Sequence, residues 1–132
     1  MMFLEGMKIM LGDKTCVKVE EVVCGDILMT ENFAQVKVIA VIDGEEDAVT
    51  YIKLQSGGNI VVSADQKFLT AKGLVEAKDL TVGEKLISTN LAEKVIETIR
   101  IQDNKKKVYG FYLEGKNLLV NVNGFWLNSC ID

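Results

Sequence analysis

The chain has 132 residues, of which 48% are hydrophobic and 26% are charged, so it can bury one globular core and is too short for two ordinary domains. A formal net charge of −4 argues against a broad nucleic-acid footprint, which needs clustered Lys and Arg. No apolar run approaches the roughly 18 residues of a membrane-spanning helix, and no secretion signal is visible. We therefore expect a single domain, residues 1–132, that binds neither nucleic acid nor membrane. The one basic cluster, residues 105–107, is expected in a solvated turn.

Short segments rich in Val, Ile and Thr, separated by Gly, Asp and Asn, predict an all-β fold. The expected strands lie near residues 7–11, 15–22, 34–42, 48–55, 59–63, 73–77, 92–102, 106–113 and 117–122. No segment has the pattern of a long amphipathic helix, although residues 19–23 and 77–80 could each form one helical turn. Near the C-terminus, Asn123 and Gly124 predict a type I′ hairpin turn, and Trp126 is expected in the core or at its rim.

An internal repeat emerges when the sequence is shifted by 58 residues, which places Gly25 on Gly83. Residues 21–28 then fall on residues 79–86, and each glycine precedes an acidic residue, as expected of a turn that leads into a strand. Further upstream, residues 10–11 fall on residues 68–69. The repeat predicts two halves, about residues 7–29 and 65–87, related by a near-twofold rotation.

The three cysteines form no CxxC pair, and an odd number of cysteines fits a reducing compartment such as the cytoplasm. In the repeat, Cys16 falls on Leu74 and Cys24 on Val82, so we expect both cysteines to be small buried hydrophobes. The chain has no His. Without His, a structural zinc site would have to use carboxylates or thiolates alone, and Ser-His or Cys-His catalysis is excluded. We expect neither a metal nor a cofactor.

Segments spread along the whole chain carry a further pattern. Residues 3–9 with 19–28, residues 63–70 with 73–84, and residues 108–109 through 124–129 follow one another in the order and spacing of splicing blocks. The chain therefore resembles the Hint family, which includes inteins and the autoprocessing domain of hedgehog proteins. This resemblance implies a horseshoe of two pseudo-twofold-related β halves. The link of residues 89–107 leaves no room for the homing endonuclease that many inteins carry.

The resemblance also implies a reaction. In such domains a first Cys or Ser attacks the preceding carbonyl, and a His in a Thr-x-x-His pattern activates that peptide. A second nucleophile after the domain accepts the acyl group. The final Asn, aided by the His before it, then cyclises to a succinimide and releases the domain. Each step requires a nucleophile within bonding reach and a nearby group that manages protons.

This sequence departs from that pattern at most positions. Met2 replaces the first nucleophile, Gln66 replaces the His of the second block, and Leu127 replaces the His before the final Asn. Asn128 remains as the candidate cyclising residue, and Ser129 as the candidate downstream nucleophile. A later loop that usually supplies an Asp or His reads Gly-Lys-Asn at residues 115–117, and residues 129–132 form a possible C-terminal extension.

Three hypotheses follow for the function. In the first, the domain keeps the fold but does not splice, because the thioether of Met2 is no nucleophile and Gln66 cannot relay a proton. In the second, Asn128 still cyclises and cleaves the chain slowly. In the third, the old cleft or an exposed strand edge serves as a binding or structural module. The expected partners are flanking segments of a host protein or another protein. If the fold is that of the Hint family, Met2, Gln66, Leu127 and Asn128 should meet at one end of the domain.

Overall fold

The fold is built almost entirely from β-strands. A computed structural model describes residues 2–116 and 118–128, and for Asn104 the backbone alone. The elements are β1 (Phe3–Leu4), β2 (Lys8–Met10), β3 (Cys16–Lys18), η1 (Val19–Glu21), β4 (Ile27–Met29), η2 (Glu31–Phe33), β5 (Gln35–Leu54), β6 (Asn59–Val62), β7 (Lys67–Thr70), β8 (Gly73–Glu76), η3 (Ala77–Asp79), β9 (Lys85–Ile87), β10 (Glu93–Leu113), β11 (Leu119–Val122) and β12 (Phe125–Asn128). The all-β prediction is confirmed. In this part of the chain no helix is long and apolar enough to cross a membrane.

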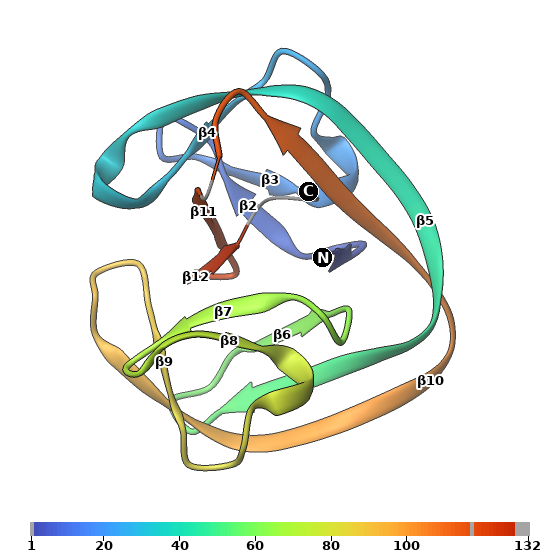
Figure 1. Cartoon of the computed structure of the whole chain (residues 1–132), viewed down its shortest axis with the longest axis vertical. Helices are drawn as coiled ribbons and strands as arrows, with labels where there is room; N and C mark the ends of the chain where they lie inside the picture. The colour runs from blue at the N-terminus through green and yellow to red at the C-terminus, as the bar shows by residue number, and fades with distance from the viewer. Residues whose placement is uncertain (1, 117, 129–132) are drawn as a thin grey trace.

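Two long strands, β5 and β10, form the frame of the molecule. They pair antiparallel from Ile96 opposite Leu54 to Leu113 opposite Val38. Figure 1 shows this curved pair running down one side and joining an upper half, which contains β2 to β4, to a lower half, which contains β6 to β9. Each long strand replaces two strands that the sequence predicts separately, so the two predicted interruptions are wrong.

The basic cluster explains one of these errors. Residues 105–107 lie inside β10 rather than in a turn. Lys106 stands opposite Glu46 and Lys107 opposite Glu45, and the register shifts between Asp103 and Lys106. Opposite charges across neighbouring strands stabilise a ladder, so a run of lysines is compatible with pairing. A bulge accommodates the extra residue without ending the strand.

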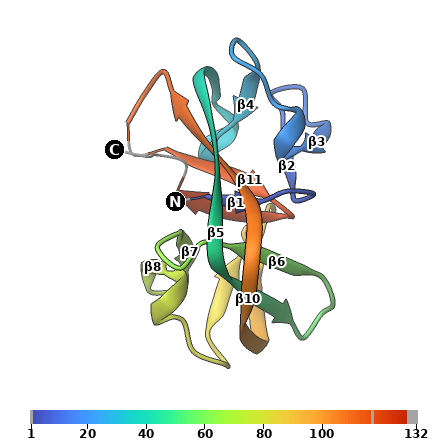
Figure 2. The same ribbon diagram turned by 90° about the vertical axis from the view of Figure 1, so that its right-hand side faces the viewer.

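The hairpin of β11 and β12 lies between the two halves (Figures 1 and 2). Strand β11 pairs with β2 through Val122 and Ile9, and β12 pairs with β7 through Leu127 and Phe68. The two-residue turn that joins them has φ of 51° at Asn123 and 87° at the following glycine. Both positive values are those of a type I′ turn, so this prediction is confirmed.

Local structure repeats between the halves. The single-turn helices η1 and η3 lie 58 residues apart, and Gly25 and Gly83 have φ of 96° and 94°. The Gly25 N–H donates to Val38 O at 2.8 Å, and the Gly83 N–H donates to Ile96 O at 2.9 Å. Upstream of β3 and β8 the offset is 59, because the β2–β3 turn has one residue more than the β7–β8 turn. The match of residues 10–11 with 68–69 is therefore off by one, and the twofold rotation itself stays a prediction.

The core spans both halves and the hairpin between them. Its fully buried aromatic and large aliphatic side chains include Phe3, Ile9, Leu28, Ile52, Leu54, Ile60, Phe68, Leu86, Ile96, Phe111 and Leu127. Trp126 is also buried, as predicted, at 3% exposure.

The two described cysteines are not part of this core. Cys16 and Cys24 are both exposed, so the expectation that they are buried is wrong. Their repeat partners explain the error, because Leu74 is 48% exposed and Val82 is 63% exposed. The apolar character of a residue in one half therefore does not indicate that the matching residue in the other half is buried. Cys130 lies outside the described residues.

Candidate functional site

A tight turn at residues 63–66 connects β6 to β7 and forms the centre of the candidate site. The Gln66 N–H donates to Ser63 O at 3.1 Å and closes the turn. The start of η3 holds it from the other side, since Ala77 N donates to Gln66 O at 2.7 Å and Lys78 N donates to Ala64 O at 2.9 Å. The backbone of the turn is thus fixed at three points.

The N-terminal strand approaches this turn through Met2. The Met2 N–H donates to Ser63 Oγ at 2.9 Å, and Ser63 N donates to Met2 O at 3.0 Å. The Ser63 hydroxyl in turn donates to Asp65 Oδ1 at 2.8 Å. Partial burial of the Asp65 carboxyl would raise its pKa, but hydrogen bonds, among them the one from Ser63, outweigh burial and hold that pKa below its ordinary value. A carboxylate–hydroxyl pair therefore holds the backbone where the chain enters the fold.

The C-terminal strand approaches the same turn through Asn128. The Gln66 side-chain nitrogen Nε2 donates to Asn128 O at 2.6 Å and to Lys67 O at 3.2 Å. The pairing of Leu127 with Phe68 sets this approach, because it aligns the end of β12 with the start of β7. Gln66 is fully buried, and its Oε1 accepts no hydrogen bond from the described residues.

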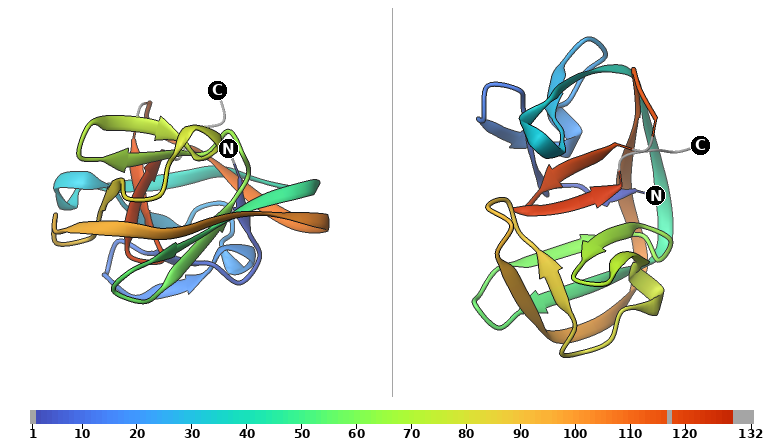
Figure 3. Two further views of the ribbon diagram at one scale, coloured as in Figure 1. Left: turned by 90° about the horizontal axis from the view of Figure 1, so that it is seen from below. Right: turned by 60° about the vertical axis from the view of Figure 1, so that its left-hand side comes forward.

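The structure therefore brings Met2, Gln66, Leu127 and Asn128 to one place. Figure 3 shows β1 and the end of β12 side by side next to β7. The Leu127 side chain is fully buried and points away from solvent into the core. Ser129 and Asn117 lie outside the described residues.

The sequence alone did not single out Ser63 and Asp65. Their spacing carried a usable signal, since a Ser or Asp just after a strand commonly bonds nearby backbone and nucleates a turn. The structure adds that the same hydroxyl receives the backbone N–H of Met2, which is 61 residues away.

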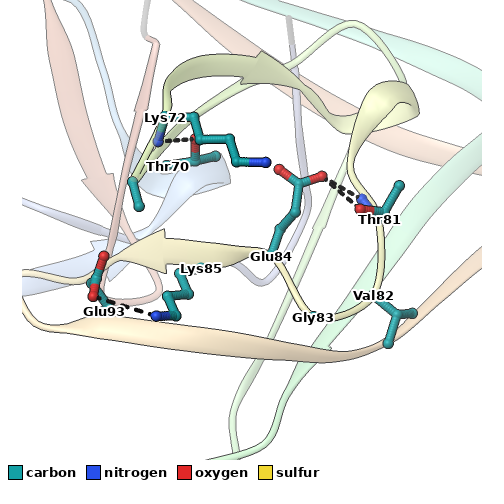
Figure 4. A pocket seen from close by; sticks show the side chains of 9 residues that line it. Thr70, Lys72, Thr81, Val82, Gly83, Glu84, Lys85 and Glu93 are labelled. Carbon is teal, nitrogen blue, oxygen red and sulfur yellow. Dashed lines mark hydrogen bonds and ion pairs between the residues drawn. The ribbon is translucent and has the colours of Figure 1, made fainter.

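A surface hollow of about 430 Å³ lies elsewhere, between the β7–β8 turn and the loop around Gly83 (Figure 4). Its polar groups bond one another: Glu84 accepts from Thr81 N at 2.7 Å, and Lys85 pairs with Glu93 at 3.9 Å. Within the described residues no three His, Cys, Asp or Glu side chains gather as a metal site. The residues at 63–66 remain the better candidate for chemistry.

No known family model and no curated protein match the sequence. Solved structures do match it. A bacterial intein-like domain from Clostridium thermocellum is 25% identical, with a TM-score of 0.83 over 96% of this chain and 97% of that chain. A DnaB intein from Synechocystis sp. PCC 6803 is 18% identical, with a TM-score of 0.84 over 98% and 99%. The Ssp DnaB mini-intein variant M86 is 17% identical, with a TM-score of 0.87 over 99% and 95%.

The chain has the Hint fold of inteins. In this Hint domain the turn at residues 63–66 contacts both the first and the last strand. Of its four residues, Asp65 alone carries an ionisable group. Gln66 can polarise a carbonyl through a hydrogen bond, but an amide side chain neither takes up nor gives up a proton at neutral pH. The arrangement is suited to holding two chain ends and to stabilising charge on one carbonyl oxygen.

Proposed function

We propose that this Hint domain does not splice. The observation that carries the proposal is the placement of Met2, whose backbone is bonded to Ser63 on both its N–H and its carbonyl. The turn therefore holds the backbone of Met2, the residue that stands where the first nucleophile belongs. A thioether sulfur has no proton to lose and forms no stable acyl ester, so the first acyl transfer has no nucleophile.

Two further replacements act in the same direction. Gln66 stands at the position of the block-two His, where a proton relay would be required, and its amide cannot serve as one. Leu127 stands at the position of the penultimate His and is fully buried, so it supplies neither a proton nor a hydrogen bond. Missing general acid–base assistance typically costs about 10²–10⁴-fold in rate for each step.

Fusion of a different reporter protein to each end of the chain tests this proposal. We expect no ligated product of the two reporters on a denaturing gel. Met2→Cys alone should not restore ligation, because the two His positions remain altered. The combined variant Met2→Cys, Gln66→His and Leu127→His should recover some product. A ligated band from the unaltered chain would overturn the proposal.

A second reaction is favoured by one contact. The Gln66 Nε2–H donates to the carbonyl oxygen of Asn128, which is the carbonyl that Asn cyclisation would attack. Slow cleavage of the bond after Asn128 is therefore our second candidate function. A reporter fused after Asp132 should be released over days, and Asn128→Ala should abolish the release. Equal release from both proteins would reject cyclisation of Asn128 as the cause.

A further inference from the structure

We propose that Gln66 is the oxyanion donor of the C-terminal cleavage: its Nε2–H stabilises the negative charge that forms on the Asn128 carbonyl oxygen when Asn128 cyclises. The inference rests on the second candidate function above. Gln66 cannot relay a proton, but in this role it contributes to catalysis by donating a hydrogen bond. It also supplies a polar contact at this carbonyl, where Leu127 has none to offer.

The first support is geometry. At 2.6 Å, the bond from Gln66 Nε2 to Asn128 O is shorter than the usual 2.9–3.0 Å or so for N–H···O bonds in proteins. The other N–H of the same amide donates to Lys67 O at 3.2 Å, which fixes the plane of the carboxamide. The Gln66 backbone is bonded through both its N–H and its carbonyl. A buried donor that is already oriented stabilises developing charge without reorganising during the reaction.

The second support is that the side-chain oxygen of Gln66 has no hydrogen-bond donor among the described residues. Gln66 Oε1 is buried and accepts no hydrogen bond from the described residues, which destabilises the folded protein. A methionine of similar length would avoid this penalty. In the first half of the fold, the position that matches Gln66 is occupied by Met7. The backbone bonds are equivalent: Met7 O accepts from Val19 N at 2.8 Å, and Gln66 O accepts from Ala77 N at 2.7 Å. The backbone arrangement at Gln66 can therefore be formed with a methionine in its place.

The reaction balances without any added reagent. The Asn128 side-chain nitrogen attacks the Asn128 carbonyl carbon, and the electron pair of the C=O bond moves to the oxygen, where the Gln66 N–H donates its hydrogen bond. Collapse of this intermediate breaks the C–N bond to Ser129. The proton lost by the attacking nitrogen ends on the departing amine of Ser129. The products are a chain ending in a succinimide and a new free N-terminus, and Gln66 keeps its own protons throughout.

Release of a reporter fused after Asp132, followed by intact mass, tests the assignment. We expect the wild-type fragment to be lighter by one water than a hydrolysed fragment ending in Asn128. Gln66→Met should slow release about 10²–10³-fold, as loss of one oxyanion donor does in other enzymes. Its thermal midpoint should stay close to that of the wild type, because removal of the unpaired Oε1 offsets the loss of the two hydrogen bonds from Nε2. The matched control is Gln55→Met, at an exposed position outside the site, which should cleave at the wild-type rate.

Each other outcome overturns a defined claim. If Gln66→Met cleaves as fast as wild type while Asn128→Ala is inert, the oxyanion role is wrong and the cleavage stands. If the wild-type fusion stays intact, both claims fall. If Gln66→Met fails to fold, Gln66→Glu decides: its protonated form can donate and its carboxylate cannot, so release should slow as pH rises. A Gln66→Glu protein that cleaves at the wild-type rate at every pH would exclude the role.

Discussion

Met7 and Gln66 occupy matching positions in the two halves, and each contacts an Asn of the β11–β12 hairpin. In the first half, Asn123 Nδ2 donates to Met7 Sδ at 3.1 Å. In the second half, Gln66 Nε2 donates to the backbone oxygen of Asn128 at 2.6 Å. The direction of donation is reversed: one Asn uses its side chain as the donor, and the other receives a donor on the carbonyl that cyclisation would attack.

The Asn123 amide is occupied by structural bonds. Its Oδ1 accepts from Lys8 N at 2.7 Å, and its Nδ2 also donates to Asn59 O at 2.8 Å. An amide nitrogen engaged in this way is not directed at its own carbonyl carbon. The comparison teaches that one backbone arrangement supports two uses of Asn: Asn123 fastens a turn, while at Asn128 the fold polarises the carbonyl.

A second comparison concerns the surface hollows beside the β2–β3 and β7–β8 turns. Gly12 N donates to Ile27 O at 2.9 Å, and Ala71 N donates to Lys85 O at 3.1 Å, so the backbone bond is the same. The side chains differ. In the first half Gln35 Nε2 bonds Gly12 O at 3.0 Å, and in the second the Lys85 ammonium faces a carboxylate. The repeat is thus one of backbone bonding, and its side chains have diverged.

The strongest test of this comparison removes the core residue that each half presents to the hairpin. Ile9 and Phe68 are both fully buried and pair with β11 and β12 respectively. Phe68→Ala should lower the free energy of unfolding by about 3–5 kcal/mol and Ile9→Ala by about 2–5 kcal/mol. Urea denaturation followed by tryptophan fluorescence measures both. The control is Leu74→Ala, at a half-exposed position, which should lower the free energy of unfolding far less.

Because the hairpin packs against both halves, each variant should still unfold in a single transition. Two separate transitions in Ile9→Ala, with the second half melting at the wild-type urea concentration, would show that the halves fold independently. The comparison between them would then describe two small domains rather than one.

The sequence predicts most of the strands that are rich in Val and Ile, but it misses five short ones, β1, β4, β7, β9 and β12. Strand β1 has two residues and exists because Phe3 pairs with Tyr109 on one side and Val62 on the other. Such pairing depends on partners far along the chain and leaves no local pattern. The long strand β5 was split for the opposite reason: Gly44 and the acidic residues after it are typical of a turn, yet they pair with β10.

The site could be predicted only in part. The block pattern identified Met2, Gln66 and Asn128 as residues that should meet, and the structure brings them together. The contact of Gln66 Nε2 with a backbone oxygen could not be predicted, because it depends on the register that places Leu127 opposite Phe68. A shift of one residue would present a different carbonyl.

A test of intermediate size separates the two Asn residues. Asn123→Ala removes three side-chain bonds and places an alanine at φ 51°, so it should lower the free energy of unfolding by about 1–3 kcal/mol. Asn123→Gly keeps the backbone conformation and should recover part of the loss. Asn128→Ala keeps the Gln66 bond, which goes to the backbone oxygen, and places no alanine in a left-handed backbone, so it should change stability less. Equal losses in Asn123→Ala and Asn128→Ala, measured by thermal unfolding, would contradict the comparison.

The smallest expected effect concerns Phe33 and Leu91, which lie 58 residues apart in the turns that follow β4 and β9. Both have left-handed backbones, with φ of 58° and 65°, and both are largely exposed, at 62% and 71%. Left-handed backbone costs an L-residue roughly 1–2 kcal/mol, whereas glycine adopts it freely but loses more entropy on folding.

Leu91→Gly should therefore stabilise the fold by about 0.5 kcal/mol, the difference between relieved strain and added chain entropy. Phe33→Gly should be closer to neutral, because the Phe33 ring also lies under the Lys14 ammonium at 5.4 Å, a contact worth about 0.5–1 kcal/mol at an exposed site. The double variant Lys14→Met, Phe33→Gly isolates the ring contact: once Lys14 is replaced, Phe33→Gly should stabilise as much as Leu91→Gly does. Thermal midpoints measured side by side give the ranking. A lower midpoint for Leu91→Gly than for the wild type would mean that Leu91 contributes more by packing over the hollow beside Trp126 than its backbone strain costs.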